Sequence, residues 1–169
     1  MKAPQITTLV AVAVMASSLG VTVRASSSDG TYFGQPLEER QLQQRLPKAQ
    51  GALWALLHKT KITENDKLGI FKASHPPEVQ ALAGKTLTVT GFMMPLDTTP
   101  KVKRFLLTRF TPVCPFCPPG APNEVVDVTS AQPVAYTEKV MTVTGKFSLM
   151  NDGEKGLFFH LDGATVARN

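Results

Sequence analysis

The residues that decide the fold are Thr86-Leu87-Thr88-Val89-Thr90-Gly91-Phe92-Met93, in the middle of the chain. Polar and apolar side chains alternate along this stretch and β-branched residues dominate it, a pattern typical of a half-buried β-strand. Pro95 is expected to end the strand, because proline cannot donate a hydrogen bond to a neighbouring strand. The stretch therefore predicts a strand at the start of a β-rich domain that begins at residue 85.

Four further stretches of the C-terminal half show strand patterns, over residues 104–110, 124–128, 140–149 and 156–162. The composition of Asn151-Asp152-Gly153 favours a hairpin turn between the last two. A short repeat, Thr-Val-Thr-Gly, ends at Gly91 and again at Gly145. Glycine inside a strand usually marks a bulge or a sharp bend, which a small closed barrel needs. Residues 85–169 are therefore predicted to form a five-stranded OB-like barrel, since a sandwich would need about seven strands.

Helices are predicted in the segment before the barrel, residues 37–84. A short amphipathic helix over 37–46 ends at Pro47, and a helical turn over 78–82 follows a pair of prolines. Between them lies a helical segment whose apolar face includes Trp54, which we expect in the core because large aromatic side chains dominate core packing. The apolar residues of the first two helices are Leu37, Leu42, Leu46, Leu53, Trp54, Leu56 and Leu57. The predicted fold class is mainly β with N-terminal helices.

The N-terminus has the features of an export signal. Lys2 precedes an uncharged stretch with an apolar middle, and Val23-Arg24-Ala25 suits a signal peptidase, so cleavage is expected after Ala25. The apolar run is shorter than a comfortable membrane span, and no second one follows. Residues 26–36 are rich in serine and glycine and are expected to be a flexible lead-in. These features predict a periplasmic mature protein that does not span the membrane.

The charge balance argues against a nucleic-acid partner. The chain has 18 Lys and Arg against 13 Asp and Glu, and removal of Lys2 and Arg24 leaves 16 against 13, a net charge of +3. The basic residues are spread out, with one local cluster at 101–104. Nucleic-acid binding domains carry a stronger and more concentrated positive charge.

The main chemical feature is a pair of cysteines, Cys114 and Cys117, the only two in the chain. In an oxidising compartment they could form a local disulfide, which would contribute only about 2 kcal/mol because the loop it closes is short. They could instead serve a thiol oxidoreductase, but Cys117 precedes Pro118-Pro119, which disfavours the helix start that activates such thiols. Catalysis is therefore not the leading expectation. The third alternative is a soft-metal site for copper or zinc.

Two thiolates do not complete a zinc site, so further ligands would have to come from elsewhere in the chain. The residues with suitable donor atoms are His58, His75, His160, Met93, Met94, Asp97 and Glu124. The loop itself is stiffened by several prolines, and Asn123 is expected to bond to backbone groups where the loop enters the next strand. The residues that shape the loop are Pro115, Pro118, Pro119, Pro122 and Asn123. A loop of this stiffness suits a ligand platform or a recognition surface.

An ordered set of motifs carries a family resemblance. They are Gly91-Phe92-Met93-Met94-Pro95-Leu96, Phe105-Leu106-Leu107, the loop 114–119, and Pro122-Asn123-Glu124-Val125-Val126. Over residues 54–166 the chain resembles a bacterial family of exported proteins of unknown function with an OB-like domain. The resemblance implies a gene neighbourhood that includes ABC transporter components for metal uptake. Many members carry one cysteine in this loop, whereas this chain also has Cys117.

The sequence thus favours a periplasmic accessory binding protein in metal handling or beside an envelope transporter, with an ABC transporter component as the partner that the resemblance implies. It would act through the loop 114–123. Two alternatives stay open at this point, a structural interaction module with a disulfide-locked loop and a thiol-disulfide oxidoreductase.

Overall fold

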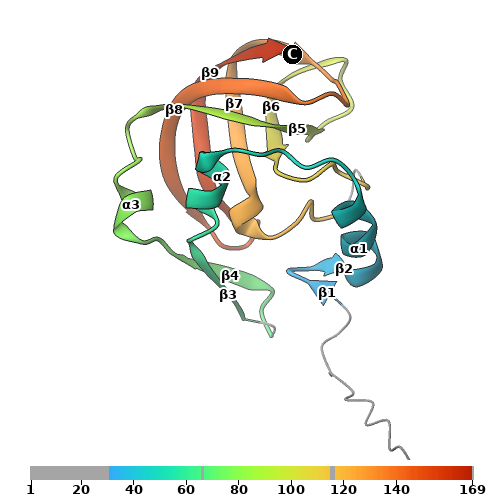
Figure 1. Cartoon of the computed structure of the whole chain (residues 1–169), viewed down its shortest axis with the longest axis vertical. Helices are drawn as coiled ribbons and strands as arrows, with labels where there is room; N and C mark the ends of the chain where they lie inside the picture. Colours follow the sequence, from blue (N-terminus) through green and yellow to red (C-terminus); the bar gives the residue numbers. More distant parts are fainter. Residues whose placement is uncertain (1–30, 66, 115–116, 169) are drawn as a thin grey trace, which may run out of the picture.

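The computed structural model describes residues 31–65, 67–114 and 117–168. The expected signal peptide, residues 1–25, and the first half of the expected lead-in lie outside these residues. The described chain is mostly β and is built around a closed barrel, with short helices and two small hairpins at one end (Figure 1). The predicted fold class, mainly β with a five-stranded barrel, is confirmed.

The barrel consists of five long strands. They are β5 (Thr86–Pro95), β6 (Lys101–Thr108), β7 (Val125–Ala135), β8 (Met141–Asp152) and β9 (Leu157–Arg168). Their order around the barrel is β5-β6-β7-β9-β8, with β8 closing back onto β5. The β7–β9 pair is parallel and the other pairs are antiparallel. Each predicted strand is present, but β7 and β9 run several residues further than their alternating patterns indicated, and β5 continues through Pro95.

The repeated tetrapeptides lie opposite each other in the sheet. Thr88 pairs with Thr144 and Val89 with Val143, so the valines face the core together and the threonine hydroxyls lie 2.8 Å apart. Gly91 is the last residue of β5 that pairs with β8, and the strand pairs with β6 from Phe92 onward. Gly145 lies at a register shift between β8 and β9. Both glycines therefore mark the places where the sheet bends, as their position inside strand patterns predicted.

The core fills the barrel and extends under the N-terminal segment. Phe105, Phe147 and Phe159 are fully buried inside it. Trp54, on helix α2 (Ala52–Leu57), closes one end of the barrel with only 2% of its surface exposed. Its indole Nε1 donates a 2.7 Å hydrogen bond to the carbonyl oxygen of Thr90, which satisfies its one polar atom. The prediction that Trp54 packs in the core is confirmed.

The N-terminal segment contains the expected helices, α1 (Leu37–Arg45), α2 and α3 (Pro77–Gln80), and two hairpins that were not predicted. Strands β3 (Lys61–Asn65) and β4 (Ile70–Ser74) form one of them within the segment taken as helical. Strands β1 (Thr31–Tyr32) and β2 (Gln35–Pro36) form the other, within the segment expected to be flexible. This second half of the expected lead-in is held in place because Gln35 is fully buried against α1.

Helix α1 packs against the rest of the protein with its polar face, whereas its leucines suggested that the apolar face would be buried. Leu37, Leu42 and Leu46 are 40–56% exposed, whereas the buried residues of the helix are Arg40 and Gln43. The physical reason is a set of buried polar partners on the barrel side, described below, which binds the polar face of the helix. Among the described residues, no helix has the length and apolar character needed to cross a membrane.

The bend at Gly91 supplies a stability prediction. A Cβ at this position would lie 2.7 Å from Leu107 Cγ and 2.8 Å from the carbonyl oxygen of Thr108, which belongs to the sheet backbone and cannot easily move. Gly91→Val should therefore lower the free energy of unfolding by about 1–3 kcal/mol, although valine normally favours strands. Denaturant unfolding measures the effect. Thr86→Val, an exposed position of the same strand, is the control, and a Gly91→Val variant as stable as this control would contradict the bend.

Candidate functional site

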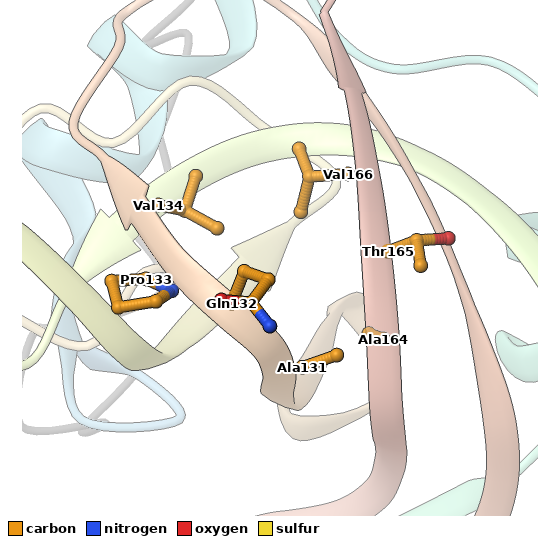
Figure 2. Close-up of a pocket in the computed structure, with 7 residues that line it drawn as sticks. All are labelled: Ala131, Gln132, Pro133, Val134, Ala164, Thr165 and Val166. Atoms are coloured by element: carbon orange, nitrogen blue, oxygen red, sulfur yellow. The ribbon is translucent and has the colours of Figure 1, made fainter.

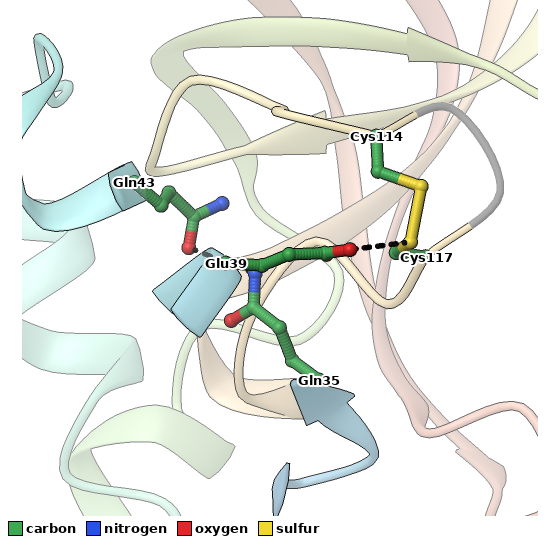
Figure 3. The surroundings of a disulfide bond; sticks show 5 residues. All are labelled: Gln35, Glu39, Gln43, Cys114 and Cys117. Carbon is green, nitrogen blue, oxygen red and sulfur yellow. Dashed lines mark hydrogen bonds between the residues drawn. A yellow bond between two sulfur atoms is a disulfide. The ribbon is translucent and has the colours of Figure 1, made fainter. Parts of the chain in front are cut away.

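The two cysteines form a disulfide in the loop between β6 and the short 3-10 helix η1 (Pro122–Glu124) (Figure 3). Their Cα atoms lie 5.3 Å apart, within the usual range for a disulfide. Both residues are only partly buried, so the sulfurs are not sealed in the core. Pro115, one of the predicted loop-shaping residues, lies outside the described residues. The structure therefore shows the oxidised form of the pair.

A carboxylate that the sequence did not single out faces this disulfide. Glu39, in the first turn of α1, places its Oε1 atom 3.2 Å from Cys117 Sγ (Figure 3). A disulfide sulfur has no proton to donate, so a hydrogen bond between these two atoms requires the reduced thiol. The other oxygen, Oε2, is buried and has no hydrogen-bond partner within the described part of the chain. The donor atoms of Glu39, Cys114 and Cys117 all lie within 4.8 Å of one another.

The direction of Glu39 is set by its neighbour, Arg40. The guanidinium of Arg40 makes two hydrogen bonds with the carboxylate of Glu124, at 2.9 and 3.0 Å, and the side chains are only 10% and 2% exposed. The rings of Tyr32 and Phe110 flank the guanidinium at 4.6 and 4.4 Å from its central carbon. Burial, and then the charge of Glu124, raises the pKa of Tyr32 above its usual value, against a smaller opposite effect of Arg40. The buried ion pair thus docks α1 against the cysteine loop.

Gln43 ties α1 to both ends of the same loop. Its side-chain nitrogen donates hydrogen bonds to the carbonyl oxygens of Thr111, at 3.2 Å, and Pro119, at 2.8 Å. Its side-chain oxygen accepts from Arg40 at 3.1 Å and from Gln35 at 3.3 Å. Because this one amide bridges the residues before and after the disulfide, the loop keeps its position relative to Glu39.

The end of the loop is ordered by polar side chains of η1. Glu124 accepts a 3.0 Å hydrogen bond from the backbone N–H of Ala121, and its Oε2 atom lies so close to Gly120 that a Cβ there would be 2.8 Å away. Asn123 bonds to backbone groups, as expected, but these are the carbonyl oxygens of His58 and Thr60 rather than those of its own loop. Pro122 is buried, whereas Pro118 is exposed.

The additional metal ligands proposed from the sequence do not converge on the cysteines. Met93 is buried in the barrel core and Met94 in a second apolar cluster with Leu106, Val125 and Leu157. Asp97 accepts hydrogen bonds from Thr99 in the β5–β6 turn, which lowers its pKa. Glu124 forms its ion pair with Arg40. In the structure these four residues have partners elsewhere, and the group with donor atoms close together consists of Glu39, Cys114 and Cys117.

The three histidines are also placed apart from the cysteines. His58 ends α2 as an exposed residue. The Nδ1 atom of His75 lies 3.1 Å from the Thr60 hydroxyl, and its ring packs against Phe158 and Phe159. His160 Nδ1 lies 3.0 Å from Asp127, a buried carboxylate that also accepts two hydrogen bonds from Arg104. These contacts explain His75 and His160 as structural groups of the helical cover and of the barrel.

Sequence reasoning missed Glu39 because it lies 78 positions before Cys117 and belongs to a helix whose leucines suggested the opposite docking. The one signal that could have found it is the density of polar residues at Glu39, Arg40 and Gln43 on a single helix.

The surface has several pockets. The pocket shown in Figure 2 lacks the side chains needed for metal binding or thiol chemistry. It has a volume of about 290 Å³ and lies where the ends of β7 and β9 diverge. Its walls are apolar or neutral residues, Ala131, Gln132, Pro133, Val134, Ala164, Thr165 and Val166. It contains none of the cysteine, acidic or histidine side chains considered above.

Comparison with known proteins places the chain in a family. A family model described as "Protein of unknown function (DUF3299)" matches residues 28–156, most of the chain. The chain belongs to the DUF3299 family. No curated protein matches it significantly. Among solved structures, a DUF3299 protein of Pseudomonas aeruginosa PAO1, determined at 2.45 Å, is 22% identical, with a TM-score of 0.44 over 58% of this chain and 69% of that one.

The buried ion pair of this DUF3299 domain is tested by a double-mutant cycle. Arg40→Met leaves Glu124 buried without its counter-charge, and Glu124→Gln does the same to Arg40, so each should cost about 3–5 kcal/mol of unfolding free energy. The double variant should cost clearly less than the sum, with a coupling above about 1 kcal/mol. The exposed pair Lys59–Glu78, whose side chains are 58% and 45% exposed, is the control and should show little or no coupling. Additive effects at Arg40 and Glu124 would contradict the docking role of the pair.

A second prediction concerns His75. Burial lowers its pKa below the ordinary value of 6.5, so the unfolded chain takes up this proton first as the pH falls. The stabilisation that depends on neutral His75 is complete above pH 6.5 and is lost as the pH drops through the lower folded pKa. The stability advantage of the wild type over His75→Gln should therefore shrink between about pH 8 and about pH 5. Urea unfolding at several pH values measures it, and an advantage that grows on acidification would contradict the assignment.

Proposed function

We propose that this protein is an exported envelope protein that binds Zn(II) through Cys114, Cys117 and Glu39 once its disulfide is reduced. The observation that carries the proposal is the placement of a half-buried carboxylate, otherwise without a partner for Oε2, beside the two sulfurs. An open zinc site has three thiolate, imidazole or carboxylate ligands from the protein and keeps a fourth position for water or another ligand. Such an open site suits a protein that takes up or passes on the ion.

The same carboxylate argues against thiol-disulfide exchange as the main activity. The attacking species in exchange is a free thiolate, and a neighbouring negative charge disfavours it. A bound dication has the opposite effect, because it neutralises both thiolates and the carboxylate together. Glu39 therefore favours a metal site over a catalytic cysteine.

The donor set also favours zinc over Cu(I). Thiolates bind both ions, but carboxylate oxygen is a harder ligand that Zn(II) accepts readily and Cu(I) does not prefer. Zinc binding releases two thiol protons, and it requires a dithiol reductant to supply two electrons to the disulfide beforehand. Export to the periplasm and action beside an envelope transporter are part of this proposal. Their support is the export signal of residues 1–25 and the resemblance described above.

The test is zinc binding by the full mature chain in both redox states. Reduced protein should bind about one Zn(II) per chain in competition with a chelating dye, and the oxidised form should bind none at this site. Cys114→Ser and Cys117→Ser should each abolish tight binding. Glu39→Gln should weaken it by about tenfold or more, because the third charged ligand is lost.

Glu38→Gln is the matched control, since Glu38 lies in the same helical turn but is exposed. It should bind zinc as the wild type does. Reduced protein that takes up no zinc would contradict the proposal in favour of a structural disulfide. Turnover of disulfide substrates without zinc binding would contradict it in favour of an oxidoreductase.

A further inference from the structure

A groove is lined by the proline-rich loop and by the two small hairpins, β1–β2 and β3–β4. Figure 1 shows these hairpins at the same end of the barrel. The volume of the groove is about 340 Å³, within the range of ligand pockets in proteins. The floor is apolar and comes from Leu106, Leu157 and Pro122, all buried. Phe33, from the β1–β2 turn, and Phe71, from β4, pack against each other with their ring centres 6.0 Å apart and form one aromatic wall.

The turn between β1 and β2 places Phe33 in an unfavourable backbone conformation at the edge of the groove. Phe33 has a φ of 49°, and it is the only described non-glycine residue with a positive φ. Glycine is the usual residue for that conformation, and a bulky side chain there costs conformational energy. The turn therefore carries an aromatic ring at the groove, at a position where glycine would have the lower conformational energy. Strain of this kind is concentrated at binding sites.

The rim of the groove is acidic although the whole chain carries a formal charge of +5. Glu64 and Glu154 lie at the rim together with one cation, Lys155. Lys155 is already paired with Asp152, with 2.8 Å between Nζ and Oδ2, and Glu64 also has an interaction within the protein. Glu154 is therefore the carboxylate that the rim offers to a ligand, next to two aromatic rings, and both features attract cations.

We infer that this groove binds an extended peptide segment of a partner protein in which a lysine or arginine lies next to an apolar side chain. The apolar side chain would occupy the floor beside the paired rings of Phe33 and Phe71. The basic side chain would lie over the aromatic rings and reach Glu154 at the rim. The glycines that line the groove, Gly34, Gly69 and Gly156, carry no side chain, so a peptide backbone can approach closely.

The test uses three short peptides and the oxidised full mature chain, so it is independent of zinc. The probes are acetyl-Leu-Lys-Leu-amide and its counterparts with glutamine or glutamate in place of lysine. NMR titration should show the lysine peptide binding at least about fivefold more tightly than the glutamate peptide, since the rim charge discriminates between them. The backbone amides of Gly69, Phe71 and Gly156 should shift. Equal binding of the three peptides, or no binding, would overturn the inference.

Two variants separate binding from folding. Phe33→Gly removes the ring and also relieves the strained φ, so it should fold at least as well as the wild type and bind the lysine peptide about tenfold more weakly. Glu154→Lys should reverse the preference toward the glutamate peptide, and Glu138→Lys, an exposed position away from the groove, should not change it. Unchanged affinity in Phe33→Gly, or equal effects of the two lysine substitutions, would contradict the assignment.

Discussion

The buried ion pair between Arg40 and Glu124 is the interaction on which the arrangement of the N-terminal segment depends. An unpaired charge in this position would be strongly unfavourable, so the pair is stable only with nearly complete hydrogen bonding. The fold supplies it: Glu124 also accepts from the loop backbone, and Arg40 also donates to Gln43 between two aromatic rings. Helix α1 can meet these requirements only with its polar face inward. Its leucines are therefore exposed, and Glu39 is directed at the cysteine loop.

The barrel could be predicted from the sequence because the patterns that specify its strands lie within short stretches of the chain. Alternation along 86–93 and the repeat that ends at Gly91 and Gly145 specify strands and their bends, and the two repeats pair with each other in the sheet. The burial of Trp54 could also be predicted, because a large apolar side chain has few places other than the core. The orientation of α1 on the barrel could not be predicted. Amphipathic patterning assumes that apolar residues drive a helix onto the core, and here long-range polar contacts determine its orientation.

The same limitation explains what was missed at the site. The spacing of the two cysteines was visible in the sequence, but the ligands proposed to accompany them lie elsewhere in the fold, most of them with partners of their own. Met93 is a core residue, His75 packs on phenylalanines, and His160 bonds to Asp127. The residue that does lie beside the sulfurs is brought there across 78 positions of sequence by the neighbouring Arg40. The loop thus presents one side to Glu39 and the other, through Pro118 and Pro122, to the aromatic groove.

If Glu39 and the two cysteines form one zinc site, X-ray absorption at the zinc edge of the reduced protein with one equivalent of Zn(II) should detect two sulfur ligands at about 2.3 Å together with oxygen ligands at about 2.0 Å. In Glu39→Gln the oxygen shell should change and the sulfur shell should stay intact. A spectrum with four sulfurs, indicating two chains that share the ion, or one with oxygen and nitrogen ligands alone would rule out this site.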